Sequence, residues 1–124
     1  MGTKDVIESY YRYATSGDWS PWCDLFTENT VIDEQMAGHI EGREKLREMM
    51  AGFPTMYTHF SNVAVHIVVE GDEAMALSHI TSVPAGSATE VQVDVANYFK
   101  LEGGLIAYMK NVHDTAPFHS ASGE

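Results

Sequence analysis

Apolar side chains recur every three or four residues through the first third of the chain, which is the period of an α-helix with one buried face. In the first such segment Val6, Tyr10 and Tyr13 share a face, and Gly17 follows as a stop signal. Ser20-Pro21 is typical of a helix start, with a capping side chain and proline in the first turn. The pattern predicts helices at residues 4–16, 20–26 and 43–50, with a strand at residues 30–36 between the last two.

From residue 56 onward the period changes to two, which is typical of β-strands with one buried face. His59 has the same parity as Val63 and Val65, so we expect its side chain on the apolar face that packs inward. On the first strand Asp33 has the same parity as Val31, so we expect it on a largely buried face. Turns that contain glycine separate the later strands, which are predicted at residues 56–69, 75–83, 91–101 and 105–114.

Helices followed by antiparallel strands predict an α+β fold. We expect three N-terminal helices packed on a strongly curved antiparallel sheet. Such a sheet forms a conical cavity with its helices, and cavities of this kind are the usual place for a small-molecule site. The 124 residues suffice for a single domain over residues 1–124, and residues 115–124 carry so few apolar side chains that we expect a flexible tail there.

Charge and cysteine content narrow the possible partners. Seven Lys and Arg against 18 Asp and Glu give a net charge of −11, which repels nucleic acid and anionic membranes, so we expect neither as a partner. The single cysteine, Cys23, cannot form an internal disulfide, and no apolar run of spanning length occurs, which favours a soluble cytoplasmic protein. His39, His66, His113 and His119 lack the spacing of metal ligands, and glycine-rich phosphate loops are absent, so we expect no metal and no cofactor.

Several short motifs occur in a characteristic order. Ser-Gly-Asp-Trp at residues 16–19 closes the first predicted helix, and Asn-Thr-Val-Ile-Asp at residues 29–33 lies on the first strand. Gly-Arg-Glu-Lys-Leu at residues 42–46 opens the third helix, and Gly-Gly-Leu-Ile at residues 103–106 leads into the last strand. Over residues 4–115 the chain thereby resembles the nuclear-transport-factor-2-like (NTF2-like) superfamily, and more closely its SnoaL-like, polyketide-cyclase-like members. The resemblance implies a cystatin-like or NTF2-like α+β barrel, a scaffold that serves isomerases, dehydratases, cyclases, hydrolases and proteins without catalysis.

Two enzyme branches of that superfamily suggest site residues. By resemblance to the ketosteroid isomerases, Tyr10 would hold an oxyanion and Asp33 would move a proton. Tyr57-Thr58-His59-Phe60 and Ser78-His79 resemble the two histidine positions of scytalone dehydratases. Asp33 is then the nearest carboxylate by topology that could orient His59, and we expect the two side chains in the cavity within hydrogen-bond reach of each other.

Together these residues predict a cofactor-independent lyase or isomerase, meaning a dehydratase, a cyclase or an enzyme of ketosteroid-isomerase-like proton transfer, that acts on a small hydrophobic ring compound. The alternative is a non-catalytic module of the same fold that binds a small ligand or takes part in assembly. His59 could equally be a core histidine, and Asp33 an exposed residue at a loop edge. The candidate catalytic residues are His59, Asp33, Tyr10 and His79, and the candidate substrate-binding residues are Tyr13, Asn97 and Asn111.

We also expect a homodimer, formed through the outer face of the sheet. Ala96, Tyr98 and Ile106 are predicted to lie there among polar side chains. Pairing of two copies would remove these apolar side chains from water, and relatives of this fold commonly pair through that surface.

Overall fold

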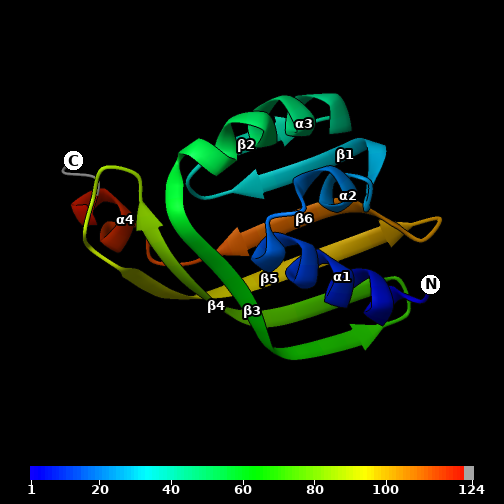
Figure 1. The fold of residues 1–124 in the computed structure, drawn as a ribbon. Coiled ribbons are helices and arrows are strands. Elements are labelled where there is room, and N and C mark those ends of the chain that lie inside the picture. Colours follow the sequence, from blue (N-terminus) through cyan, green and yellow to red (C-terminus); the bar gives the residue numbers. More distant parts are fainter. Residues whose placement is uncertain (122–124) are drawn as a thin grey trace.

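The computed structural model describes residues 1–121 as helices laid on one sheet (Figure 1). The helical elements are α1 (Thr3–Ser16), α2 (Trp19–Cys23), α3 (Arg43–Gly52), the short 3₁₀ turn η1 (Phe53–Thr55) and α4 (Ala116–Ala121). The strands are β1 (Phe26–Glu34), β2 (Gly38–Glu41), β3 (Tyr57–Glu70), β4 (Glu73–Pro84), β5 (Val91–Glu102) and β6 (Leu105–Val112). The three predicted N-terminal helices and the later strands are confirmed, but the second helix ends at Cys23 and the first strand already begins at Phe26. The short strand β2 was not predicted.

The strands form one six-stranded sheet in the order β2-β1-β6-β5-β4-β3. All neighbours are antiparallel except β1 and β6, which run parallel. The sheet is open, with β2 and β3 at its edges, and β3 bends strongly around the helices (Figure 1). The predicted α+β class is therefore confirmed, but the sheet does not close into a barrel and its strands are not all antiparallel.

Helix α1 supplies much of the contact between the two layers. It ends at Gly17, whose φ of 75° is left-handed and free of steric cost only for glycine. The ring of Tyr10 packs edge to face on Phe99 of β5, with ring centroids 5.1 Å apart. The largest fully buried side chains come from both layers and are Phe26, Phe99, Ile7, Ile32, Leu101 and Ile106.

Strand β3 presents the opposite face to the core from the one that its sequence predicts. Val63 and Val65 are exposed, at 54% and 59%, whereas Asn62 is buried and Ala64 packs against the core. Irregularities in the β3–β4 register change the facing of side chains near His59 and again after Ala64. Alternation defines which side chains share a face, but here the outer face is as apolar as the inner one, so the inward assignment of His59 is wrong.

The C-terminal segment also differs from the prediction. Residues 116–121 form helix α4 instead of a tail without structure, and Phe118 is buried against Val91, Val93 and Val95 of β5. Residues 122–124 of the predicted tail lie outside the described residues. None of the helices within residues 1–121 is long and apolar enough to cross a membrane.

Candidate functional site

A cavity of about 310 Å³ lies between the curved sheet and the helices. This volume is at the lower end of the range of about 300–1,000 Å³ that is usual for small-molecule sites. Most of its wall is apolar. The aromatic side chains in it are Tyr10, Trp19, Trp22, Phe53, Tyr57, Phe60 and Phe118, and the methionines are Met36, Met49, Met50, Met56 and Met109.

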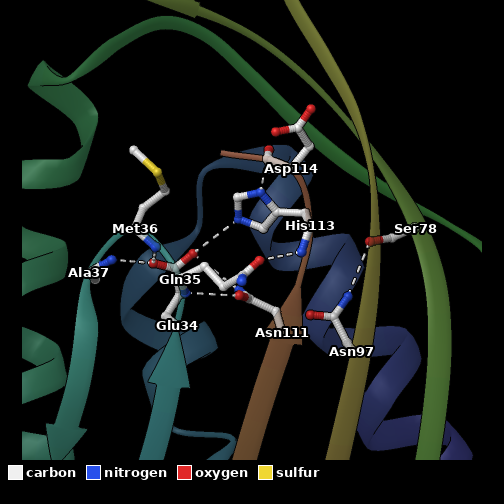
Figure 2. Close-up of polar contacts among 9 residues, drawn as sticks. All are labelled: Glu34, Gln35, Met36, Ala37, Ser78, Asn97, Asn111, His113 and Asp114. Atoms are coloured by element: carbon white, nitrogen blue, oxygen red, sulfur yellow. Dashed lines mark hydrogen bonds and ion pairs between the residues drawn. The ribbon is translucent and has the colours of Figure 1, made fainter. Parts of the chain in front are cut away.

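A carboxylate, an amide and an imidazole meet at one end of the cavity, at the ends of β1 and β6 (Figure 2). We call Glu34, Asn111 and His113 the Glu34 cluster. One Glu34 oxygen, Oε2, accepts hydrogen bonds from the backbone N–H groups of Met36, at 2.7 Å, and of Ala37. The other oxygen, Oε1, accepts a bond from the side-chain amide of Asn111 at 3.1 Å. These donors hold the carboxylate in one orientation.

The parallel pairing of β1 and β6 continues through side chains beyond the last strand residues. The backbone N–H of Gln35 donates to Oδ1 of Asn111 at 3.1 Å, and the backbone N–H of His113 donates to the side-chain oxygen of Gln35. Backbone groups that would otherwise lose their partners at the end of β1 and β6 are thereby satisfied. The same bonds fix His113 beside Glu34, as Figure 2 shows.

The imidazole of His113 has an acceptor at each ring nitrogen. Its side chain is only 3% exposed, and Nε2 lies 3.6 Å from Oε1 of Glu34, whose side chain is 23% exposed. Nδ1 lies 2.9 Å from the backbone carbonyl oxygen of Asp114. A carbonyl can only accept, so Nδ1 carries a hydrogen and Nε2 is the nitrogen at which a proton can be gained or lost. When Nε2 is protonated, the ring forms an ion pair with Glu34.

Two tyrosines that line the cavity lie close enough to Glu34 for its negative charge to affect their pKa values. Burial, followed by Tyr11 and Glu34, holds the pKa of Tyr10 well above its ordinary value. Burial, followed by Glu34, raises the pKa of Tyr57 as well. Both hydroxyls therefore stay protonated. The hydroxyl of Tyr10 has no hydrogen-bond partner among residues 1–121, which leaves it available as a donor to a ligand.

The charge of the wall limits the kind of ligand that fits. Glu34 and His113 are the ionisable acid and base that line the cavity, and no Lys or Arg is among the described residues of its wall. A carboxylate or phosphate ligand would lack a lasting counter-charge in these apolar surroundings. The cavity is therefore suited to an uncharged, largely apolar molecule.

Comparison with protein families identifies the family of this chain. The family model of the SnoaL-like domain matches residues 7–109. The chain belongs to the SnoaL-like domain family. This SnoaL-like chain is 27% identical over 112 residues to an uncharacterized PhzA/B-like protein from Pseudomonas aeruginosa, a match that covers 86% of this chain and 79% of that protein.

Solved structures agree with the family. A hypothetical protein with a ketosteroid isomerase-like fold from Catenulispora acidiphila, in complex with trimethylamine, superimposes with a TM-score of 0.85 at 16% identity, covering 95% of this chain and 92% of that chain. A candidate SnoaL-like polyketide cyclase from a Jannaschia species gives a TM-score of 0.79 at 19% identity, covering 96% and 90%. At these identities the likeness concerns the fold, and it agrees with the NTF2-like fold that the sequence predicts.

Of the residues predicted for the site, Tyr10 and Asn111 line the cavity of this SnoaL-like chain. Asp33 does not, because it points to the other side of β1 from Ile32 and Glu34. Its carboxylate accepts a bond from Tyr108 at 2.6 Å and pairs with His39 at 2.6 Å. These bonds, the one from Tyr108 first, lower the pKa of Asp33. The inward carboxylate of β1 is therefore Glu34, one residue later than predicted.

The two predicted histidines lie outside the cavity. His59 is exposed, is paired with Val83 in the register of β3 and β4, and makes no contact with Asp33, so its predicted position is wrong. His79 lies on the outer face of the sheet, where Asp94, at 2.9 Å, and then Gln92 raise its pKa.

The remaining two candidates also lie elsewhere than predicted. Tyr13 is half-buried on α1 under the guanidinium of Arg12, 5.2 Å from the ring centre, and is not part of the cavity wall. Asn97 faces inward, but its amide donates to Tyr11 at 2.9 Å and to Ser78 at 3.2 Å inside the protein. Figure 2 shows the bond to Ser78 on strands beside the Glu34 cluster.

Sequence reasoning missed Glu34 and His113. The signal for Glu34 was present, because it shares its parity with the apolar Ile32 on the first strand. For His113 the signal was weaker: Asn111 and His113 also share parity, but only the parallel pairing of β6 with β1 brings them to Glu34.

Proposed function

We propose that this SnoaL-like protein is a cofactor-independent lyase or isomerase that moves a proton on a small, uncharged, hydrophobic ring compound. The observation that carries the proposal is the pair formed by His113 and Glu34 in a largely apolar cavity. The predicted combination of a histidine and a carboxylate is thereby assigned to His113 and Glu34 instead of His59 and Asp33.

The proposed roles follow from the contacts of each group. His113 takes a proton from carbon next to a ligand carbonyl at Nε2, since Nδ1 is held as a donor to Asp114. The backbone carbonyl of Asp114 orients the ring through Nδ1, and Glu34 balances the charge of the imidazolium that forms when Nε2 takes the proton. Tyr10 donates its free hydroxyl to the oxygen on which negative charge develops. Return of the proton to another carbon gives isomerisation, and loss of a leaving group from the enolate gives elimination.

The names of the similar proteins support this class of reaction. One structural neighbour has a ketosteroid isomerase-like fold and another is a candidate SnoaL-like polyketide cyclase. Reactions of both kinds begin with a proton taken from carbon beside a carbonyl, which needs a positioned base and an oxyanion donor but no metal or redox group.

A proton-exchange experiment tests the proposal without the natural substrate. The probe is 2-tetralone, a small hydrophobic ring ketone, whose exchange of α-protons for deuterium is followed by NMR in D₂O against a blank without protein. We expect faster exchange with the protein, and a loss of about 10²-fold or more in His113→Gln. Glu34→Gln loses less, because Glu34 stabilises the imidazolium but does not itself take the proton. Circular dichroism checks that both variants fold.

Matched controls come from the residues predicted first. His59→Gln and Asp33→Asn change the same residue types outside the cavity, so they should exchange 2-tetralone at the wild-type rate. If His59→Gln loses the activity and His113→Gln keeps it, the proposed assignment is wrong.

A binding module without catalysis remains the second candidate. It is favoured by the full set of donors on Glu34, since a carboxylate held by Met36, Ala37 and Asn111 also serves as a purely structural group at the cavity end. The two functions separate in the same experiment. A protein that binds 2-tetralone but leaves its proton exchange at the blank rate is a binding module.

We further propose a homodimer that pairs through the outer face of the sheet. Large apolar side chains are exposed there on neighbouring strands: Val63, Val65, Val68, Met75, Leu77 and Val112. Ala96 and Tyr98 align with Leu77 and Met75 in the β4–β5 register, whereas Ile106 is fully buried and is not part of this face. Wild-type protein should sediment at twice the mass of 13.7 kDa, and Leu77→Asp should shift it to a monomer. A wild-type monomer contradicts the proposal.

A further inference from the structure

Asn62 is a polar residue in the cavity wall that lies apart from the Glu34 cluster. It is 6% exposed, lies on β3, and lines the cavity. Its backbone is held against helix α1 by Thr15, whose hydroxyl donates to the carbonyl of Asn62 at 3.0 Å and accepts from its N–H at 3.1 Å. The side chain is thus presented from a fixed position.

The side-chain amide of Asn62 forms no hydrogen bond within residues 1–121. Its oxygen is fully buried without a partner, and no bond from its nitrogen is found either. The buried oxygen destabilises the folded protein, because water has been removed from it and nothing has replaced the water. A rigidly held polar side chain that has no hydrogen-bond partner inside the protein is typical of a ligand contact.

The place of Asn62 in the sheet defines which part of a ligand it would meet. β3 is one edge of the sheet, whereas Glu34 lies on β1, next to the other edge. The wall also carries the apolar side chains of Trp19, Phe60 and Ile80. A ligand that reaches both Asn62 and the Glu34 cluster therefore combines an apolar body with two polar groups.

We propose that Asn62 binds a hydroxyl group of the ligand that is distinct from the reacting carbonyl. An amide offers one acceptor and one donor side by side, and a hydroxyl is the small uncharged group that can donate to the first and accept from the second. The ligand class is then a hydroxylated ring compound. This inference rests on the proposed function only in taking the cavity as the ligand site.

A binding cycle with two probes tests the assignment. Naphthalene and 2-naphthol differ by one hydroxyl, and binding of either should quench the fluorescence of Trp19 and Trp22 in the cavity wall. For wild-type protein we expect 2-naphthol to bind about 3- to 10-fold more tightly, the effect of one net hydrogen bond. Asn62→Leu and Asn62→Ala should lose this preference and still bind naphthalene, whereas the exposed control Asn29→Leu should keep it.

Stability provides a second readout. Unliganded Asn62→Leu should melt at or above the wild-type temperature, because the unsatisfied amide is gone and the Thr15 bonds involve only the backbone. A lower melting temperature would mean a structural role and would overturn the inference. So would a preference for 2-naphthol that survives in both variants. Loss of proton exchange in wild-type protein contradicts the proposed function instead, since it leaves the 2-naphthol preference unaffected.

Discussion

Replacement of Asn97 by leucine should strongly destabilise the protein. The Asn97 amide, 1% exposed, donates to the hydroxyls of Tyr11 and Ser78. Leucine has nearly the same size but no donor, so Asn97→Leu leaves two buried hydroxyls that have lost a partner. The burial of Tyr11, which also raises its pKa, keeps water from replacing the amide.

The size of the effect follows from the number of groups left without a partner. A buried polar group that loses its partner costs about 1–3 kcal/mol, so the two hydroxyls together predict about 2–6 kcal/mol. Domains of this size unfold with a free energy of about 5–15 kcal/mol, so the loss is a large fraction of the total. With a urea m-value of about 2 kcal/mol/M, the unfolding midpoint should fall by about 1–3 M.

Urea unfolding of two variants separates this explanation from a simple loss of packing. Removal of the whole network, in Tyr11→Phe/Ser78→Ala/Asn97→Leu, leaves no buried group unpaired and should restore most of the stability lost in Asn97→Leu. A triple variant less stable than the single one would refute the reasoning. An Asn97→Leu variant as stable as the wild type would refute the reasoning too, and Asn97 would again be a candidate ligand contact.

Two further predictions concern exposed and terminal groups. Bonds to Asp33 and then to Glu41 raise the pKa of His39, so its ring should titrate above about 6.5 by NMR and move back toward that value in Asp33→Asn. The stabilisation by this raised pKa is complete below pH of about 6.5 and is lost as the pH rises through the folded-state value. Phe118→Ala, which removes a buried ring that packs on β5 and contacts His113, should lower the free energy of unfolding by about 3 kcal/mol in urea.

Regular alternation predicts burial well where only one face of a strand is apolar. On β5 the odd positions from Val91 to Leu101 are all buried and the even positions lie on the other face, as their sequence indicates. The inward direction of Asn97 follows from the same pattern. What the pattern does not contain is the partner of that amide, because Tyr11 lies 86 residues away.

Prediction of the site failed where the choice depended on a shift of one residue. Asp33 and Glu34 are adjacent carboxylates, and a strand turns them to opposite faces. On β3 both faces carry apolar side chains, so alternation alone does not define which face packs on the core. The register irregularities that turn His59 outward leave no signal in the sequence. His113 reaches Glu34 only through a parallel pair of strands that lie more than 70 residues apart in the chain, a contact that local periodicity does not report.

The two ends of the cavity wall differ in stiffness. The Glu34 cluster is held to the backbone by hydrogen bonds at nearly every polar atom, so its geometry is fixed. Elsewhere the wall contains Met49, Met50 and Met56, whose unbranched thioether chains change rotamer at little cost and fill irregular spaces. Substitutions among these methionines can therefore change the outline of the ring that fits without disturbing the acid–base groups, which makes them the natural positions for redirecting this scaffold to new ligands.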